Sequence, residues 1–248
     1  MYTSSYLSHS SIGSTIHRKC IIAFKHKIPL LTLSYTHKHL SYKHPSYSSR
    51  LISSISKGIN SNNNVQKKIP LTPKQKRLID CMIRIDQAGE IGANYIYKGQ
   101  LAILGSDKKV SPIIKEMWEQ EKFHLKTFDE IIARFRVRPT ILRPIWEAVG
   151  FIVGAGTAMM GKEAAMACTE AVETVIGQHY NDQLRELLSI DHEDIAELRK
   201  IIKEFRDDEL QHLDTAVDFD AKKAPFHGPL TAIIHHGCKA AIWITGRL

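Results

Sequence analysis

One fifteen-residue pattern occurs twice in this chain. Residues 113–127 read I-I-K-E-M-W-E-Q-E-K-F-H-L-K-T, and residues 201–215 read I-I-K-E-F-R-D-D-E-L-Q-H-L-D-T. Each copy contains a Glu-x-x-His motif, formed by Glu121 with His124 and by Glu209 with His212. Because residues three apart share one face of a helix, each motif directs a carboxylate and an imidazole to the same place. These ligand types suit a transition metal such as iron or manganese better than calcium or a Cys-rich zinc site.

A further glutamate precedes each copy of the repeat. Glu90 lies upstream of the first copy and Glu173 upstream of the second, and each is followed seven residues later by a tyrosine, Tyr97 or Tyr180. Four helices that contribute, in turn, Glu, Glu-x-x-His, Glu and Glu-x-x-His form the dinuclear carboxylate site of ferritin-like bundles. A single Glu-x-x-His is weak evidence, since both residues are common on solvated helix faces. Two copies in a repeated frame are strong evidence for such a site.

The first 68 residues differ in composition from the rest of the chain. They contain no Asp or Glu, ten Lys or Arg and many Ser, and the first acidic residue of the chain is Asp80. Basic, Ser-rich and acid-free segments are typical of organelle transit peptides. The alternative is a basic tail that contacts nucleic acid or anionic lipid. We expect a mitochondrial transit peptide and linker over residues 1–68, followed by one folded domain over residues 69–248.

The net charge of +8 belongs to this basic segment. Residues 69–248 keep 24 basic residues against all 26 acidic ones, a net charge of −2. A nucleic-acid partner is therefore not expected. The four cysteines form no C-x-x-C pair and no disulfide framework, which fits a reducing compartment and buried thiols.

The remaining pattern predicts an all-α fold. Thr72-Pro73 opens a helix to about residue 104, Ser111-Pro112 opens a second that ends before Pro139, a third runs from Lys162 to about residue 189, and Asp191 is a plausible cap for a fourth. These four helices carry the candidate ligands. We expect a ferritin-like four-helix bundle built from duplicated helix pairs.

Two apolar segments are left over. Residues 144–160 carry one charge and several glycines, and residues 230–244 follow a break around Pro225 and Pro229. Both fall short of the roughly 20 apolar residues that span a membrane. Such helices are either buried or lie in a membrane interface, and we favour two membrane-interface helices over two helices that cap the core. Phe151, Ile152 and Met159 are the expected lining of a substrate path between helices.

Four segments carry a resemblance to a known family: I-R-I-D-Q-A-G-E-I-G-A-N-Y-I-Y-K-G-Q, M-W-E-Q-E-K-F-H-L, G-A-G-T-A-M-M-G-K-E-A-A-M-A-C-T-E-A-V-E and F-R-D-D-E-L-Q-H-L-D. Over residues 72–248 the chain closely resembles the demethoxyubiquinone hydroxylase family of ubiquinone biosynthesis. The resemblance implies a di-iron monooxygenase on the matrix face of the mitochondrial inner membrane. It would hydroxylate a demethoxy-ubiquinol ring, with O2 as co-substrate and NADH as ultimate reductant. It also implies a biosynthetic complex with a lipid-binding accessory protein.

By motif, the resemblance places the two Fe ions on six ligands: Glu90, Glu121, His124, Glu173, Glu209 and His212. The glutamates of the two Glu-x-x-His motifs are the natural bridges, so Glu90 and Glu173 would be terminal, with one histidine per metal. Acidic residues usually orient ligating histidines, and the candidates are Asp86, Asp208 and Glu204. Tyr97, Tyr180 and His179 are secondary candidates for a role beside the ligands, and for both tyrosines an ordinary core position is the stronger interpretation.

Two other functions are compatible with the same sequence features. A di-iron quinol oxidase would reduce O2 to water without modifying the quinol. A ferritin-like iron store, or a quinone-binding scaffold with a structural metal, would not turn over at all. The flanking motifs favour the hydroxylase over the oxidase, and the two apolar segments argue against a soluble, cage-forming store.

Overall fold

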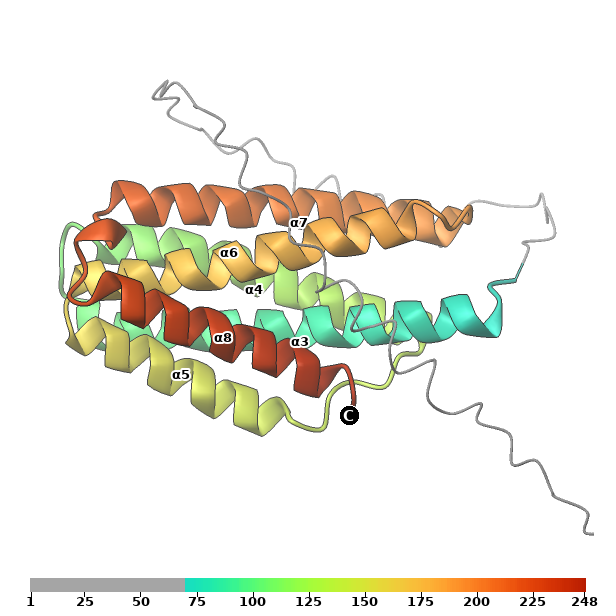
Figure 1. Ribbon diagram of the computed structural model, residues 1–248, viewed down its shortest axis with the longest axis horizontal. Coiled ribbons are helices and arrows are strands. Elements are labelled where there is room, and N and C mark those ends of the chain that lie inside the picture. Colours follow the sequence, from blue (N-terminus) through green and yellow to red (C-terminus); the bar gives the residue numbers. More distant parts are fainter. Residues whose placement is uncertain (1–69) are drawn as a thin grey trace, which may run out of the picture. The chain divides into compact units, whose positions relative to one another are not determined.

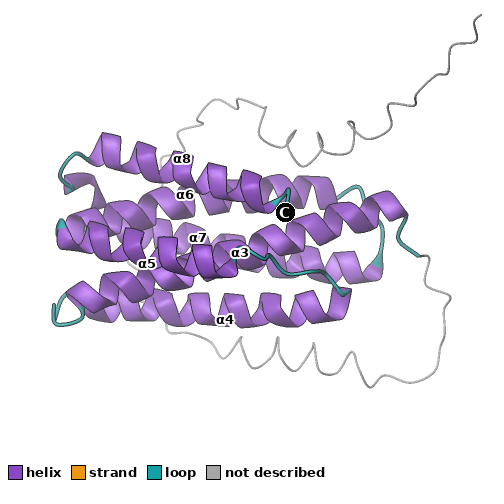
Figure 2. Cartoon of the chain, turned by 90° about the horizontal axis from the view of Figure 1, so that it is seen from below, coloured by secondary structure: helices purple, strands orange, loops and turns teal. Residues whose placement is uncertain are grey.

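Helices make up almost all of the part of the chain that the structure, a computed structural model, describes, which is residues 70–248. In chain order they are α3 (Pro73–Leu104), α4 (Ser111–Phe135), α5 (Arg143–Met159), α6 (Lys162–Leu187), α7 (Glu193–Asp218), the short 3-10 helix η1 (Ala221–Lys223) and α8 (His227–Thr245). Figure 2 shows only helices and loops over these residues, so the all-α prediction is confirmed there. The transit peptide predicted for residues 1–68 lies outside the described residues.

The duplicated helix pairs form the bundle. α4 packs on α3 and α7 packs on α6, so each copy of the fifteen-residue repeat belongs to the second helix of a pair. α5 connects the two pairs and lies along α3, whereas α8 lies along α6 (Figure 1). The four helices that carry the predicted ligands are therefore neighbours, and the two apolar helices cover α3 and α6 from outside. This all-helical arrangement is consistent with a ferritin-like fold.

Glycines bring α5 unusually close to α3. A Cβ atom added at Gly154 would lie 2.0 Å from the carbonyl oxygen of Ile96, and one added at Gly150 would lie 2.5 Å from that of Gly92. On the facing helix, a Cβ at Gly99 would lie 2.4 Å from the Phe151 carbonyl oxygen. The glycines of the apolar segment thus serve close backbone packing, a use that follows from their missing side chain.

The helix starts follow the local sequence, with two corrections. Thr72 and Gln75 form the capping box at the start of α3, with the Gln75 side chain accepting from the Thr72 amide at 2.9 Å. The prediction that Asp191 caps α7 is wrong, because the cap is His192, whose Nδ1 accepts a hydrogen bond from the Asp194 amide at 3.2 Å. α8 begins at His227 and not at residue 230. Its first turn includes Pro229, which is tolerated because the amide N–H that proline lacks would have no hydrogen-bond partner within the first turn of a helix.

The apolar helices expose much of their hydrophobic surface. On α5, Ile152 is 68% exposed and Met159 is 70% exposed, and on α8, Ile233 is 72% exposed and Trp243 is 53% exposed. Within residues 70–248 no helix combines the length and the hydrophobicity needed to cross a membrane.

Candidate metal centre

The structure brings all six predicted ligands together in the middle of the bundle. They come from four helices, and every one is at least 97% buried: Glu90 on α3, Glu121 and His124 on α4, Glu173 on α6, Glu209 and His212 on α7. They form two overlapping groups, one of Glu90, Glu121, His124 and Glu209 and one of Glu121, Glu173, Glu209 and His212. Within each group the ligand atoms lie within 4.8 Å of one another. Glu121 and Glu209 belong to both groups, which is where bridging carboxylates would stand.

Both histidines point Nδ1 at the carboxylates. His124 Nδ1 lies 3.6 Å from Glu90 Oε2 and 3.3 Å from Glu209 Oε1. His212 Nδ1 lies 3.2 Å from Glu121 Oε1 and 3.3 Å from Glu209 Oε2. Glu209 therefore divides its two oxygens between the two histidines. One histidine belongs to each group, as the sequence pattern predicts.

The ligand atoms themselves fit a metal centre. Six of them are buried without a hydrogen-bond partner: Oε2 of Glu90, both carboxylate oxygens of Glu121, Oε2 of Glu209, and Nδ1 of His124 and His212. Buried polar atoms are normally paired, because an unpaired one costs about 1–3 kcal/mol. An unpaired set of oxygens and imidazole nitrogens that converges on two points matches the donor preference of iron or manganese.

The electrostatics of the cluster point the same way. Burial raises the pKa of the Glu90 carboxyl to about 8, and burial together with the nearby Glu209 charge raises the pKa values of Glu121 and Glu173. Burial also opposes the ionisation of Glu209, but the adjacent histidines outweigh it and hold the pKa of Glu209 below its usual value. Three of the four carboxylates thus resist ionisation in this dry site, and two divalent cations would favour the charged form of all four.

The second ring nitrogen of each histidine contacts the other half of the bundle. His124 Nε2 lies 3.1 Å from Asp208 Oδ2, and His212 Nε2 lies 2.7 Å from Gln120 Oε1. Such contacts fix the ring orientation of ligating histidines. Of the three acids predicted for this role, Asp208 alone contacts a histidine of the cluster within the described chain. Gln120 was missed, although it occupies the position in the first repeat that Asp208 occupies in the second.

The two tyrosines also reach across the bundle. The Tyr97 hydroxyl donates to Glu173 Oε1 at 2.9 Å, and the Tyr180 hydroxyl donates to Glu90 Oε1. Each tyrosine is fully buried and follows one terminal glutamate in the chain but binds the other. They are core residues, as the stronger interpretation had it, and their hydroxyl partners are the predicted terminal ligands.

His179 belongs to a separate polar network. The Nε2 atom of His179 lies 3.3 Å from Asp86 Oδ1 and 2.9 Å from the side-chain nitrogen Nε2 of Gln183. Gln183 Nε2 also donates to Asp86 Oδ1 at 2.6 Å. Burial raises the pKa of Asp86, although the contact with His179 opposes this. Asp86 therefore supports His179 instead of a ligating histidine, which corrects its predicted role.

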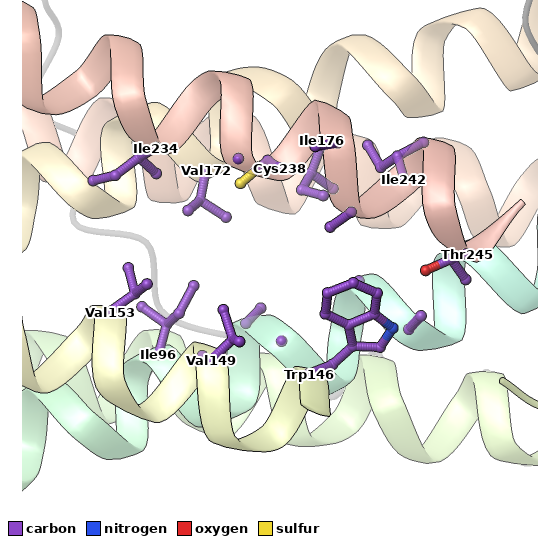
Figure 3. A pocket seen from close by; sticks show the side chains of 18 of the residues that line it. Ile96, Trp146, Val149, Val153, Val172, Ile176, Ile234, Cys238, Ile242 and Thr245 are labelled. Carbon is purple, nitrogen blue, oxygen red and sulfur yellow. The ribbon is translucent and has the colours of Figure 1, made fainter. Parts of the chain in front are cut away.

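An apolar cavity of about 340 Å³ lies between α3, α5, α6 and α8. Figure 3 shows side chains of α5, among them Trp146 and Val153, facing those of α8, among them Ile234 and Ile242. Val149 and Ile233 line the cavity and are also exposed, so it opens to the surface. Phe151, Ile152 and Met159, the predicted lining of a substrate path, do not line this cavity, because α5 turns its other side to it.

The cavity and the cluster share a wall. Ala88, Gly89, Gly92 and Ala93 of α3 and Val172 of α6 line the cavity, and they neighbour Glu90 and Glu173 in sequence. Gly89 faces α6 there, since an added Cβ atom would lie 3.7 Å from Ile176 Cδ1. An apolar molecule in the cavity would therefore lie against the helices that carry Glu90 and Glu173.

Comparison with known proteins shows the family of the chain. The model of the ubiquinone biosynthesis protein COQ7 family matches residues 77–245. The NADPH-dependent 3-demethoxyubiquinone 3-hydroxylase, mitochondrial, of Mus musculus is 54% identical over 169 residues, 68% of this chain and 77% of the relative. The 5-demethoxyubiquinone hydroxylase, mitochondrial, of Saccharomyces cerevisiae is 45% identical, over 72% of this chain and 82% of the relative. The 3-demethoxyubiquinol 3-hydroxylase of Rhodospirillum rubrum is 43% identical, over 74% and 84%. The chain belongs to the COQ7 family of ubiquinone biosynthesis proteins.

Proposed function

We propose that the chain is a monooxygenase that hydroxylates the ring of a demethoxy-ubiquinol, a late step of ubiquinone biosynthesis. The observation that carries this proposal is the pair of overlapping, fully buried Glu/His groups in a member of this family. The names of the relatives supply the reaction type and the substrate class.

Two Fe ions are the proposed occupants. Glu90 and His124 would hold one ion, Glu173 and His212 the other, and Glu121 and Glu209 would bridge them. Bound iron supplies the activation of O2. The chain orients the ligands: Asp208 and Gln120 hold the imidazole rings, and Tyr97 and Tyr180 occupy one oxygen of each terminal carboxylate. One oxygen atom of O2 enters the ring, and the other leaves as water with two electrons and one proton from the reductant and a second proton from the solvent.

The electrons are proposed to come from a reduced nicotinamide nucleotide. The resemblance predicts NADH as ultimate reductant, whereas the names of the mammalian relatives specify NADPH. The same purified protein supplied with each nucleotide in turn decides between them. The nucleotide that sustains product formation without an added reductase is the direct electron donor.

The apolar cavity is the proposed site for the isoprenoid quinol. It is lined by the exposed Val149 and Ile233, and the same two helices also expose Ile145 at 51% and Trp243 at 53%. A quinol with a long isoprenoid tail resides in the bilayer, so this face is proposed to lie on the inner mitochondrial membrane, on its matrix side. A ubiquinone-biosynthesis complex with a lipid-binding accessory protein is the proposed setting.

Product analysis by mass tests this function. Purified protein loaded with iron is incubated with a demethoxy-ubiquinol, reduced nicotinamide nucleotide and isotopically labelled O2. The hydroxylase predicts a substrate that gains one labelled oxygen atom. A quinone that is merely oxidised indicates the quinol oxidase, and absence of turnover with full iron occupancy indicates a store or scaffold. Either of these results overturns the proposal.

A further inference from the structure

The cavity beside the metal centre contains one unpaired hydrogen-bond donor. Its lining is apolar except for a few groups, and the Nε1 atom of Trp146 is the only lining side-chain atom that is buried without a partner within the described residues. The contrast with Trp118 is direct, since its Nε1 donates to Asn94 Oδ1 at 3.2 Å. An unpaired buried donor is rare in a folded protein and calls for an acceptor.

The indole ring of Trp146 stands inside the cavity. Figure 3 shows it rising from α5 into the space that faces α8, with its nitrogen on the side toward Thr245. Thr245 lines this end of the cavity and is one of its few polar residues. The other end is lined by Ile96, Val153 and Ile234. Trp146 Nε1 and Thr245 thus lie at one end of a cavity whose lining is otherwise largely apolar.

The end of the cavity that holds Trp146 lies beside the part of α3 that carries Glu90. Gly150 packs against the backbone of Gly92, and α5 runs parallel to α3, because Gly154 packs in the same way against Ile96. Trp146 lies one turn before Gly150 and is therefore level with residues 88 and 89, next to Glu90. At that level Gly89 and Ile176 line the cavity.

We infer that the Nε1–H of Trp146 is a specificity-determining donor that binds an oxygen of the substrate ring, a quinone carbonyl or a quinol hydroxyl. This inference rests on the proposed function for the identity of the substrate. The bond places the ring at the Gly89 end of the cavity and directs the isoprenoid tail toward Val153 and Ile234. Trp146 acts as a positioning residue: it orients the ring beside the ligand helices and takes no part in the oxygen chemistry.

A binding experiment with Trp146→Phe tests this inference. Phenylalanine keeps an aromatic ring in the cavity and removes the N–H. Equilibrium dialysis of the full-length protein uses two probes, a ubiquinone with a short isoprenoid tail and a hydrocarbon with the same tail on an unsubstituted benzene ring. We expect quinone binding to weaken roughly 3- to 10-fold, the usual worth of one hydrogen bond, and hydrocarbon binding to change by less than about 2-fold.

Val153→Ala is the matched control. It changes the cavity lining without adding or removing a polar atom, so it should weaken the binding of both probes alike. Equal losses of both probes in Trp146→Phe would reduce Trp146 to a packing residue and overturn the inference, as would unchanged quinone binding. Thermal unfolding and iron content establish that each variant is folded. Because the assay involves neither O2 nor turnover, a selective loss of quinone binding supports the inference even if the mass assay finds no hydroxylation.

Discussion

The polar contacts around the candidate metal centre connect the helix pair α3–α4 with the helix pair α6–α7. Asp208 of α7 contacts the histidine of α4, and Gln120 of α4 contacts the histidine of α7. In the same way, Tyr97 of α3 donates to Glu173 of α6, and Tyr180 of α6 donates to Glu90 of α3. Each half thus orients ligands of the other, so neither helix pair alone holds a complete set.

Tyr97→Phe tests this exchange at one residue. The substitution removes the hydroxyl that donates to Glu173 Oε1 and leaves the aromatic packing in place. Loss of such a supporting contact typically weakens metal affinity about 10- to 100-fold. We expect one of the two irons, the one held by Glu173 and His212, to be removed by a chelator at correspondingly lower concentration.

Tyr95→Phe on the same helix is the control, since Tyr95 contacts Lys98 and not the cluster. Identical chelator curves for Tyr97→Phe and the unmodified protein would show that the hydroxyl contributes nothing to metal binding.

Among the helices, α5 can pack as close to α3 as it does only because of its glycines. Gly154→Ala puts a Cβ atom 2.0 Å from the Ile96 carbonyl oxygen, so the helix must move and the overpacked crossing should cost about 1–3 kcal/mol. Gly156→Ala meets no atom within 4 Å and should stabilise the helix by about 0.5–1 kcal/mol. Urea unfolding of both variants measures the difference. Equal midpoints would contradict the close packing.

The exposed face of α5 is the element on which the membrane proposal depends. Phe151→Asp with Ile152→Asp places two carboxylates where lipid is proposed, and each costs up to roughly 3 kcal/mol in the bilayer. Flotation with liposomes that mimic the inner mitochondrial membrane should decrease while iron content stays intact, because Phe151 is 37% exposed and Ile152 is 68% exposed.

Leu188→Asp is the control for this pair. Leu188 is 71% exposed beyond the end of α6, so the same kind of substitution there should leave flotation unchanged. If the α5 pair floats as the unmodified protein does, this helix has no part in membrane binding. If iron is lost together with flotation, the two residues belong to the core.

For the whole molecule, the basic first segment is proposed to be removed in mitochondria. Its composition, with ten Lys or Arg and no acid in 68 residues, is typical of an organelle transit peptide. N-terminal sequencing of the protein from its native mitochondria should begin between about residues 55 and 69. Recovery of an intact Met1 from that source would exclude a cleaved transit peptide.

The fold and the ligand cluster were predictable from sequence because both follow from helical spacing. The repeat set the order of ligand helices, and Glu121 and His124 share a face wherever that segment is helical. Contacts between helices were not predictable in this way. The role of Gln120, the crossed partners of Tyr97 and the side of α5 that faces the cavity depend on how the helices rotate against one another.

The iron content of three purified proteins tests the central claim most directly. The unmodified chain should bind two irons, Glu90→Ala should lose chiefly one, and Glu209→Ala should lose both, because Glu209 belongs to both groups of ligands. Thermal unfolding shows whether each variant remains folded. Two irons per chain retained in Glu209→Ala would contradict a dinuclear centre bridged by this residue.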